Sequence, residues 1–321
     1  MASRFRLAVR IQRFEVWSCV LLVAVVAITA LIVRARLDGV GAPVECLTPW
    51  IFPDVVIDAA RCDPLNAAFF RISRNEADVV MTAMYVLPLV VGLLLGAGLV
   101  GREIEGGTAP TVWALAGSRR RWLVGRVVPI LLILVAVLAF AAIASDMLAA
   151  AKVPWQLGRP SFDDAERHGP GVIARGLAAF GVALAVGAWS GRMLPAILIS
   201  SLVALSLAIG GYLLLDTWVH ANAHEVDVPF RFNGEYDGGR YVGHNYYLPD
   251  GSIVDNGFDL AALAPPGVDP DAWVASLKDV AIGVHSPDYP AWLLTEVATF
   301  GAIGLACLAA TFAIVERRRP F

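Results

Sequence analysis

Charged side chains and glycines crowd into one short stretch between two long apolar segments. The stretch reads Gly101-Arg102-Glu103-Ile104-Glu105-Gly106-Gly107-Thr108, and it is followed by Trp113 and by Arg119-Arg120-Arg121-Trp122. Carboxylates and guanidinium groups at a surface form charge-assisted hydrogen bonds with opposite charges on a partner or with phosphate head groups. The residue types therefore predict a contact site for another molecule.

The same residues predict a short helix at this site. Gly106-Gly107 lets the backbone turn sharply. Thr108 can cap a helix that follows it, and Pro110 is acceptable in a first turn. The helix is expected to cover 109–116 along the membrane surface, ahead of Arg119 and Arg121. A plain charged loop that only fixes topology is the alternative.

Two histidines, His220 and His224, are spaced for metal binding if they share a helix, because residues four apart lie on one face. A zinc hydrolase of the HExxH type needs a glutamate beside the first histidine, where this chain has Ala221. The pair is a weak candidate, and the prediction is that the chain holds no metal, no cofactor and no catalytic residue.

Composition places the chain in a membrane. It is 58% hydrophobic and only 17% charged, with a mean hydropathy of +0.66, whereas a soluble domain carries about 25% charged residues. Uncharged segments recur, and that at 79–100 alone would form about 33 Å of helix, enough to cross a bilayer core. We therefore expect an all-α polytopic membrane protein with six transmembrane helices.

Charge density orients these helices. Arginines precede the first span and follow the last, and they are much denser at both chain ends and in 101–126 than in the other loops. The positive-inside rule then predicts cytoplasmic N- and C-termini. The expected segments are spans at 16–33, 79–100, 127–145, 172–190, 193–215 and 292–315, cytoplasmic segments at 1–15, 101–126 and 316–321, and outer loops at 34–78, 146–171 and 216–291.

Three of these segments carry further expectations. Residues 1–15 have an amphipathic pattern, which fits either a helix lying on the inner leaflet or an ordinary positive flank. The fourth span is short unless Arg175 snorkels to the interface. Cys46 and Cys62 fall on the oxidising side and predict a disulfide. The first and last outer loops together predict a small α+β or loop-rich extracytoplasmic domain.

The 101–126 loop resembles the corresponding loop of ABC-2-type ABC transporter permeases, and the actinobacterial branch most closely. The similarity is carried by Arg102-Glu103-x-Glu105, then Gly107-Thr108, then Trp113 five residues on, then Arg119-x-Arg121-Trp122. Six spans and cytoplasmic ends also fit that family. In the family this loop forms a coupling helix that sits in a cleft of an ATPase subunit. The resemblance therefore implies an ATPase interface made of Glu103, Glu105, Gly107, Thr108, Trp113, Arg119 and Arg121.

The resemblance implies a permease subunit of a bacterial exporter in the plasma membrane, paired with a second copy or a sister permease and in contact with membrane lipids. It gives no reason to expect nucleic acid as a partner. The chain has no P-loop, because neither Lys152 nor Lys278 follows a glycine. ATP and magnesium are thus expected in a separate ATPase subunit. The alternative is a membrane-anchored outer domain that binds or hydrolyses something.

A surface carboxylate contributes little stability. Glu103 is therefore expected to matter more for coupling than for folding.

Overall fold

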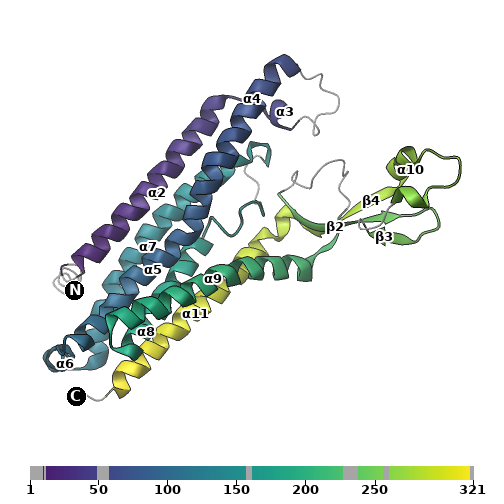
Figure 1. Cartoon of the computed structure of the whole chain (residues 1–321). Helices are drawn as coiled ribbons and strands as arrows, with labels where there is room; N and C mark the ends of the chain where they lie inside the picture. Colours follow the sequence, from purple (N-terminus) through teal and green to yellow (C-terminus); the bar gives the residue numbers. More distant parts are fainter. Residues whose placement is uncertain are drawn as a thin grey trace.

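The computed structural model describes residue 10 and residues 12–48, 58–156, 161–226, 238–255 and 260–318. Within these residues, 6 helices are long and apolar enough to cross a membrane. This confirms the six-span, all-α prediction (Figure 1). The helices that contain the spans are α2 (Arg13–Val40), α5 (Asp78–Glu105), α7 (Arg119–Lys152), α8 (Gly171–Ser190), α9 (Met193–Asn222) and α11 (Tyr289–Arg317).

The helices extend well past the apolar limits read from the sequence. The region expected as a first outer loop is largely helical, with α3 (Val44–Leu47) and α4 (Ala59–Ile72) in it. A π-helical turn at Ser73–Ala77 joins α4 to α5, so Ala59–Glu105 forms one helix of 47 residues. Charged residues end an apolar run but are compatible with a helix, because Arg and Glu have good helix propensity. Hydropathy therefore located the spans and missed their helical extensions.

Cys46 on α3 and Cys62 on α4 form a disulfide, with their Cα atoms 5.0 Å apart. The amide of Asn66 donates a hydrogen bond to the carbonyl oxygen of Cys46 at 3.0 Å, which fixes the same two helices. The disulfide closes a loop with a sequence separation of 16. Closing a loop of that length stabilises a fold by about 3 kcal/mol.

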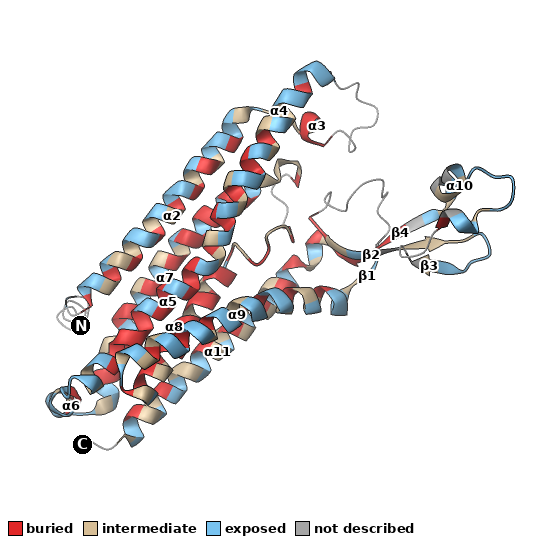
Figure 2. Ribbon diagram, viewed as in Figure 1, coloured by how far each residue is buried: buried red, intermediate tan, exposed pale blue. Residues whose placement is uncertain are grey.

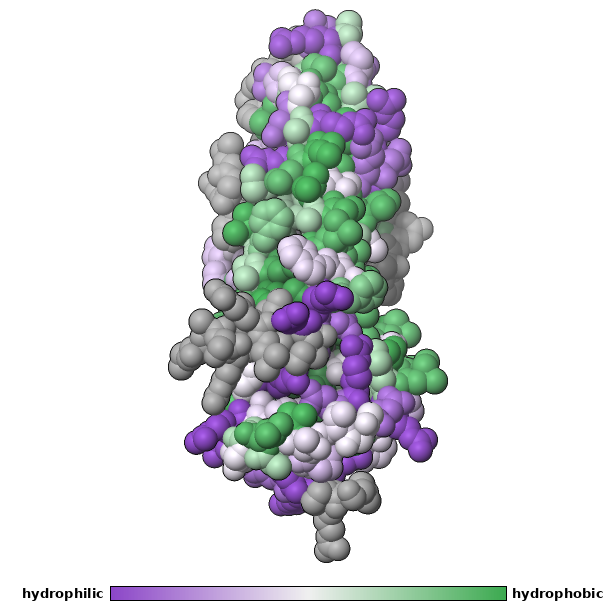
Figure 3. Space-filling model, turned by 90° about the vertical axis from the view of Figure 1, so that its left-hand side faces the viewer, coloured by the Kyte–Doolittle hydropathy of each residue, from purple (hydrophilic) through white to green (hydrophobic). Residues whose placement is uncertain are grey.

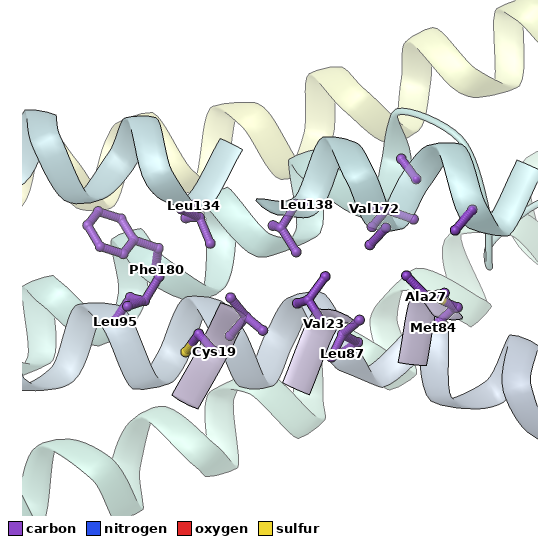
Figure 4. Close-up of a cluster of buried hydrophobic side chains, with 14 of the residues drawn as sticks. Cys19, Val23, Ala27, Met84, Leu87, Leu95, Leu134, Leu138, Val172 and Phe180 are labelled. Carbon is purple, nitrogen blue, oxygen red and sulfur yellow. The ribbon is translucent and has the colours of Figure 1, made fainter. Parts of the chain in front are cut away.

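The core of the bundle is formed by α2, α5, α7 and α8. Figure 4 shows their buried side chains meeting, among them Cys19 and Val23 of α2, Met84 of α5, Leu138 of α7 and Phe180 of α8. Buried residues line the inner faces of these helices, whereas the outward faces of α2 and α9 are exposed (Figure 2). Those outward faces are apolar. On one side of the molecule, hydrophobic side chains gather between hydrophilic ones above and below (Figure 3).

Helices α5 and α8 pack backbone against backbone. A Cβ placed at Gly92 would collide with the carbonyl oxygen of Gly176, and it would lie 2.8 Å from the Phe180 nitrogen. One placed at Gly96 would lie 2.6 Å from the Phe180 carbonyl oxygen. Glycines four apart on a membrane helix allow this close approach. The seam formed by Gly92, Gly96 and Gly176 therefore holds α5 and α8 in direct main-chain contact.

The last outer loop folds into a four-stranded antiparallel sheet in the order β1-β4-β2-β3. The strands are β1 (His224–Val226), β2 (Arg240–Tyr247), β3 (Ile253–Asp255) and β4 (Lys278–Val284), with α10 (Pro270–Ser276) before β4. The sheet meets the second outer loop, where the Phe162 nitrogen donates to the Gly238 carbonyl at 2.7 Å. The disulfide-bonded helices α3 and α4 lie elsewhere (Figure 1). Among the described residues, the outer loop that contacts the sheet is thus the second one. From the sequence, the first outer loop was expected in that place.

Two further expectations meet different outcomes. Arg175 does not snorkel: its side chain is 0% exposed and faces Glu296 of α11. The expected helix at 1–15 falls mostly outside the described residues, which include only its end, where α2 already begins at Arg13.

Candidate functional site

A short helix, α6 (Ala109–Ala116), lies at the same end of the bundle as the start of α2 and the end of α11 (Figure 1). It has the bounds expected from the sequence, and Pro110 falls in its first turn. Gly107 with φ 66° and Gly117 with φ 75° turn the chain at either side of it. Thr108 does not cap the helix as expected, because its hydroxyl donates back to the Glu103 carbonyl at 3.2 Å.

The two faces of α6 differ sharply. Trp113 points into the bundle and is buried, and its ring packs edge-on against Trp122 of α7 with centroids 6.1 Å apart. Leu115 points outward and is 84% exposed. The helix has no charged residue, and its outward residues are Pro110, Thr111, Ala114 and Leu115. We call these four residues the α6 face, and they present an uncharged surface that the described chain leaves uncovered.

The acidic and basic residues that precede α6 bind other helices of the same chain. Glu103 pairs with Arg126 of α7, and both side chains are 15% exposed. Arg102 pairs with Glu15 of α2. The Glu105 carboxylate accepts a hydrogen bond at 2.8 Å from the Met193 nitrogen, which is the first backbone N–H of α9. The Arg102-Glu103-x-Glu105 pattern therefore fastens the end of α5 to three neighbouring helices.

Glu103 thus differs from the surface carboxylate that the sequence suggested. Its partner Arg126 is also largely buried, so truncating Glu103 would leave a positive charge without its partner. The expectation that Glu103 is dispensable for folding has therefore lost its premise.

Arg119 links α6 to the end of the last helix. Its guanidinium lies over the Trp113 ring, with Cζ 4.7 Å from the centroid. The Nη1 atom donates to the carbonyl oxygens of Val315 at 3.2 Å, Glu316 at 2.8 Å and Arg318. The last carbonyls of a helix have no partner within it, so this arginine caps the C-terminus of α11.

Arg318 continues the same connection to another helix. Its Nη1 donates to the carbonyl oxygen of Ala188 and, at 3.4 Å, to that of Trp189, both in the last turn of α8. Arg119 and Arg318 therefore connect α6, α11 and α8 in series. We call these two residues the arginine relay.

The structure thus divides the seven residues of the expected interface. Glu103, Glu105, Trp113 and Arg119 face other parts of the same chain, and Gly107 and Thr108 form the turn before α6. Arg121 is exposed, as is its neighbour Arg120. A partner would therefore meet the α6 face together with these two arginines.

Sequence reasoning missed Leu115, Arg126 and Arg318. Leu115 had a visible signal, because an apolar residue two positions from a buried tryptophan falls on the other side of a helix. Arg126 and Arg318 had no such signal in the sequence. Their partners lie on other helices, and one sequence does not show which helices are neighbours.

The two histidines, His220 and His224, were only a weak candidate for a metal site, and the structure separates them. His220 is on α9, but α9 ends at Asn222 and His224 begins β1, so the two do not share a helix face. The histidine at 220 bonds the backbone of Asp216 instead. No group of three or more His, Cys, Asp or Glu residues is placed to hold a metal ion within the described ranges. The spacing of His220 and His224 therefore no longer supports a hydrolase on the outer side.

Comparison with known protein families gives a match. The model of a family described as ABC-2 membrane transporter related matches residues 16–218, well over half of the chain. The match covers α2 to α8 and most of α9, with the α6 site inside it, and it ends before the outer sheet. No curated protein and no solved structure matches.

Proposed function

Because the chain belongs to the ABC-2 membrane transporter related family, we propose that it is the permease subunit of an exporter driven by a separate ATPase subunit. Membership of the family and six membrane-capable helices make it a multi-pass transporter subunit. The direction of transport, the ATPase and a bacterial plasma membrane are parts of the proposal. The same holds for a second permease, either another copy or a sister chain.

The α6 face is the observation that supports the ATPase partner. Leu115 is 84% exposed at the tip of a rigidly mounted helix, and Arg120 and Arg121 follow it. An apolar anchor beside positive charges suits a cleft with apolar walls and an acidic rim. The chain lacks the P-loop lysine, so ATP and magnesium belong to that partner.

The arginine relay supports a mechanism. A force applied to α6 reaches the C-terminus of α11 through Arg119, and it reaches α8 through Arg318. Helix α11 leads directly from the sheet at its other end, through a turn at Ser286–Asp288. Movement of α6 is thus passed to the outer side of the bundle along one helix.

The experiment that tests the function is co-purification. The chain is expressed with an ATPase encoded beside its gene, and the complex is assayed for ATP hydrolysis. We expect a stable complex whose ATPase activity exceeds that of the ATPase subunit alone. Absence of binding to that ATPase would contradict the proposal.

Orientation gives a prediction of its own. Ala114 on the α6 face and Ala262 near the sheet are both exposed, and both can be replaced by cysteine. In intact cells, Ala114→Cys should resist an impermeant thiol reagent and Ala262→Cys should react with it. The two native unpaired cysteines, Cys19 and Cys307, serve as the background. Labelling at Ala114→Cys alone would reverse the assigned topology.

A further inference from the structure

A charged pair is buried between two membrane-capable helices. Arg175 of α8 and Glu296 of α11 have side chains that are 0% and 2% exposed, and Arg175 Nε lies 3.4 Å from Glu296 Oε1. Glu296 falls in the second turn of α11, roughly 10 Å from its start. The pair therefore lies within the bundle near its outer end.

Several polar atoms of this pair have no partner among the described residues. Arg175 Nε donates to the Gly171 carbonyl at 3.2 Å, but both terminal nitrogens, Nη1 and Nη2, have no hydrogen-bond partner. The Oε2 atom of Glu296 also has none, nor does Nε1 of the fully buried Trp292 one turn away. Tyr85 closes the other side, with Arg175 Cζ 4.7 Å from its ring centroid.

Folding alone does not account for such a pair. A buried ion pair can often be replaced by apolar residues of similar size without loss of stability, because desolvation offsets the attraction. Ionisable residues inside a membrane bundle commonly mark the path of a substrate or ion. The unpartnered atoms are two donor nitrogens of Arg175 and one acceptor oxygen of Glu296. Together they can bind a ligand that has both a hydrogen-bond acceptor and a hydrogen-bond donor.

We propose that Arg175 and Glu296 form a binding site for a zwitterionic group of the transported molecule, an inference that rests on the proposed transport function. The two free guanidinium nitrogens bind an anionic oxygen group, and the free carboxylate oxygen binds an ammonium group. A ligand that is only anionic would meet Glu296 and the nearby carboxylate of Glu166, and one that is only cationic would meet Arg175. Charge complementarity therefore selects a ligand that carries both signs.

The carboxylate of Glu296 is packed tightly against the start of α8. It lies against Gly171, the first residue of α8, where any side chain would collide with it. The positive end of that helix favours the carboxylate there. Occupation by a ligand thus requires α8 and α11 to separate at their outer ends, which links binding to the helices that the arginine relay joins.

The test uses the purified full chain without an ATPase, with binding measured by native mass spectrometry. The zwitterions are alanyl-alanine and short-chain phosphatidylethanolamine, and the anion is short-chain phosphatidylglycerol. We expect one zwitterion to bind at least about tenfold more tightly than the anion, since a charge-assisted contact contributes about that factor. Which zwitterion binds separates a soluble substrate from a lipid.

The variant Arg175→Met with Glu296→Leu should keep the melting temperature and lose zwitterion affinity at least about tenfold. Glu296→Gln keeps the shape of the side chain and should lose zwitterion affinity to the same extent. This variant tests the site if the double variant does not fold. The matched control is Arg36→Met with Glu76→Leu, an ion pair outside the bundle core, which should bind as the wild type does.

Equal binding by wild type and Glu296→Gln, or no preference for either zwitterion, overturns the inference. An ATPase complex that forms without zwitterion binding would leave the proposed function intact and remove only this site. Zwitterion binding without any ATPase complex would leave the binding site intact and remove the proposed function.

Discussion

Replacing Leu115 by aspartate should weaken binding of the ATPase subunit by roughly 30- to 700-fold. An apolar anchor at the centre of an interface contributes about 2–4 kcal/mol, and each 1.4 kcal/mol is a factor of ten. Because Leu115 is already 84% exposed, the change should cost little folding stability. Affinity is measured by titrating the purified ATPase against the labelled permease in nanodiscs.

The control for this variant is Leu263→Asp, an equivalent change at an exposed leucine next to the sheet. It should bind the ATPase as the wild type does. A Leu115→Asp protein with wild-type affinity would show that the α6 face is not the contact, and the exposed arginines at 120 and 121 would then be the remaining candidates.

Replacing Arg119 by methionine should leave ATPase binding within about twofold and abolish transmission to the last helix. The methionine keeps an apolar side chain against Trp113, but it offers no donor to the carbonyls of Val315, Glu316 and Arg318. Hydrogen bonds from a charged group contribute about 1.5–3 kcal/mol each at most. A fall in melting temperature should accompany the loss.

Transmission is measured as the change in amide hydrogen exchange of α11 when ATP and vanadate are added to the complex. The wild type should show this change and Arg119→Met should not. Arg71→Met removes an exposed charge on α4, outside the proposed contact, and should behave as the wild type. If Arg119→Met keeps the full exchange response, the signal does not run through the arginine relay.

Elements with a local signature could be predicted from the sequence. The six spans follow from uncharged runs, and α6 follows from the glycines and the proline that enclose it. The strand β2 (Arg240–Tyr247) also has a local signature, because three tyrosines and a valine precede a Pro-Asp-Gly-Ser turn. In each case the information lies within a few residues of the element itself.

The partners of the charged residues could not be predicted. Glu103 meets Arg126 only because α5 and α7 are neighbours, and Glu105 meets the start of α9 only because that helix begins beside the same turn. A motif shows that such residues belong together without showing whether they face a partner or one another. Here most of them face one another.

Arg175 illustrates the same limit. A lone arginine near the end of a span is usually a snorkelling residue, and Glu296 lies far away in the sequence. Only the packing of α8 against α11 brings the two charges together, away from water.

The seam of Gly92, Gly96 and Gly176 has a mechanical consequence. Where side chains interdigitate, two helices can slide by changing rotamers, but here the contact is between main chains, which have no rotamers to change. Helices α5 and α8 must therefore translate together as one rigid body. Gly181 of α8 and Gly304 of α11 make a second contact of this kind, which holds the middle of α11 to the same body. A hinge of this transporter then lies at the border with α9, which meets the body through side chains such as that of Tyr85.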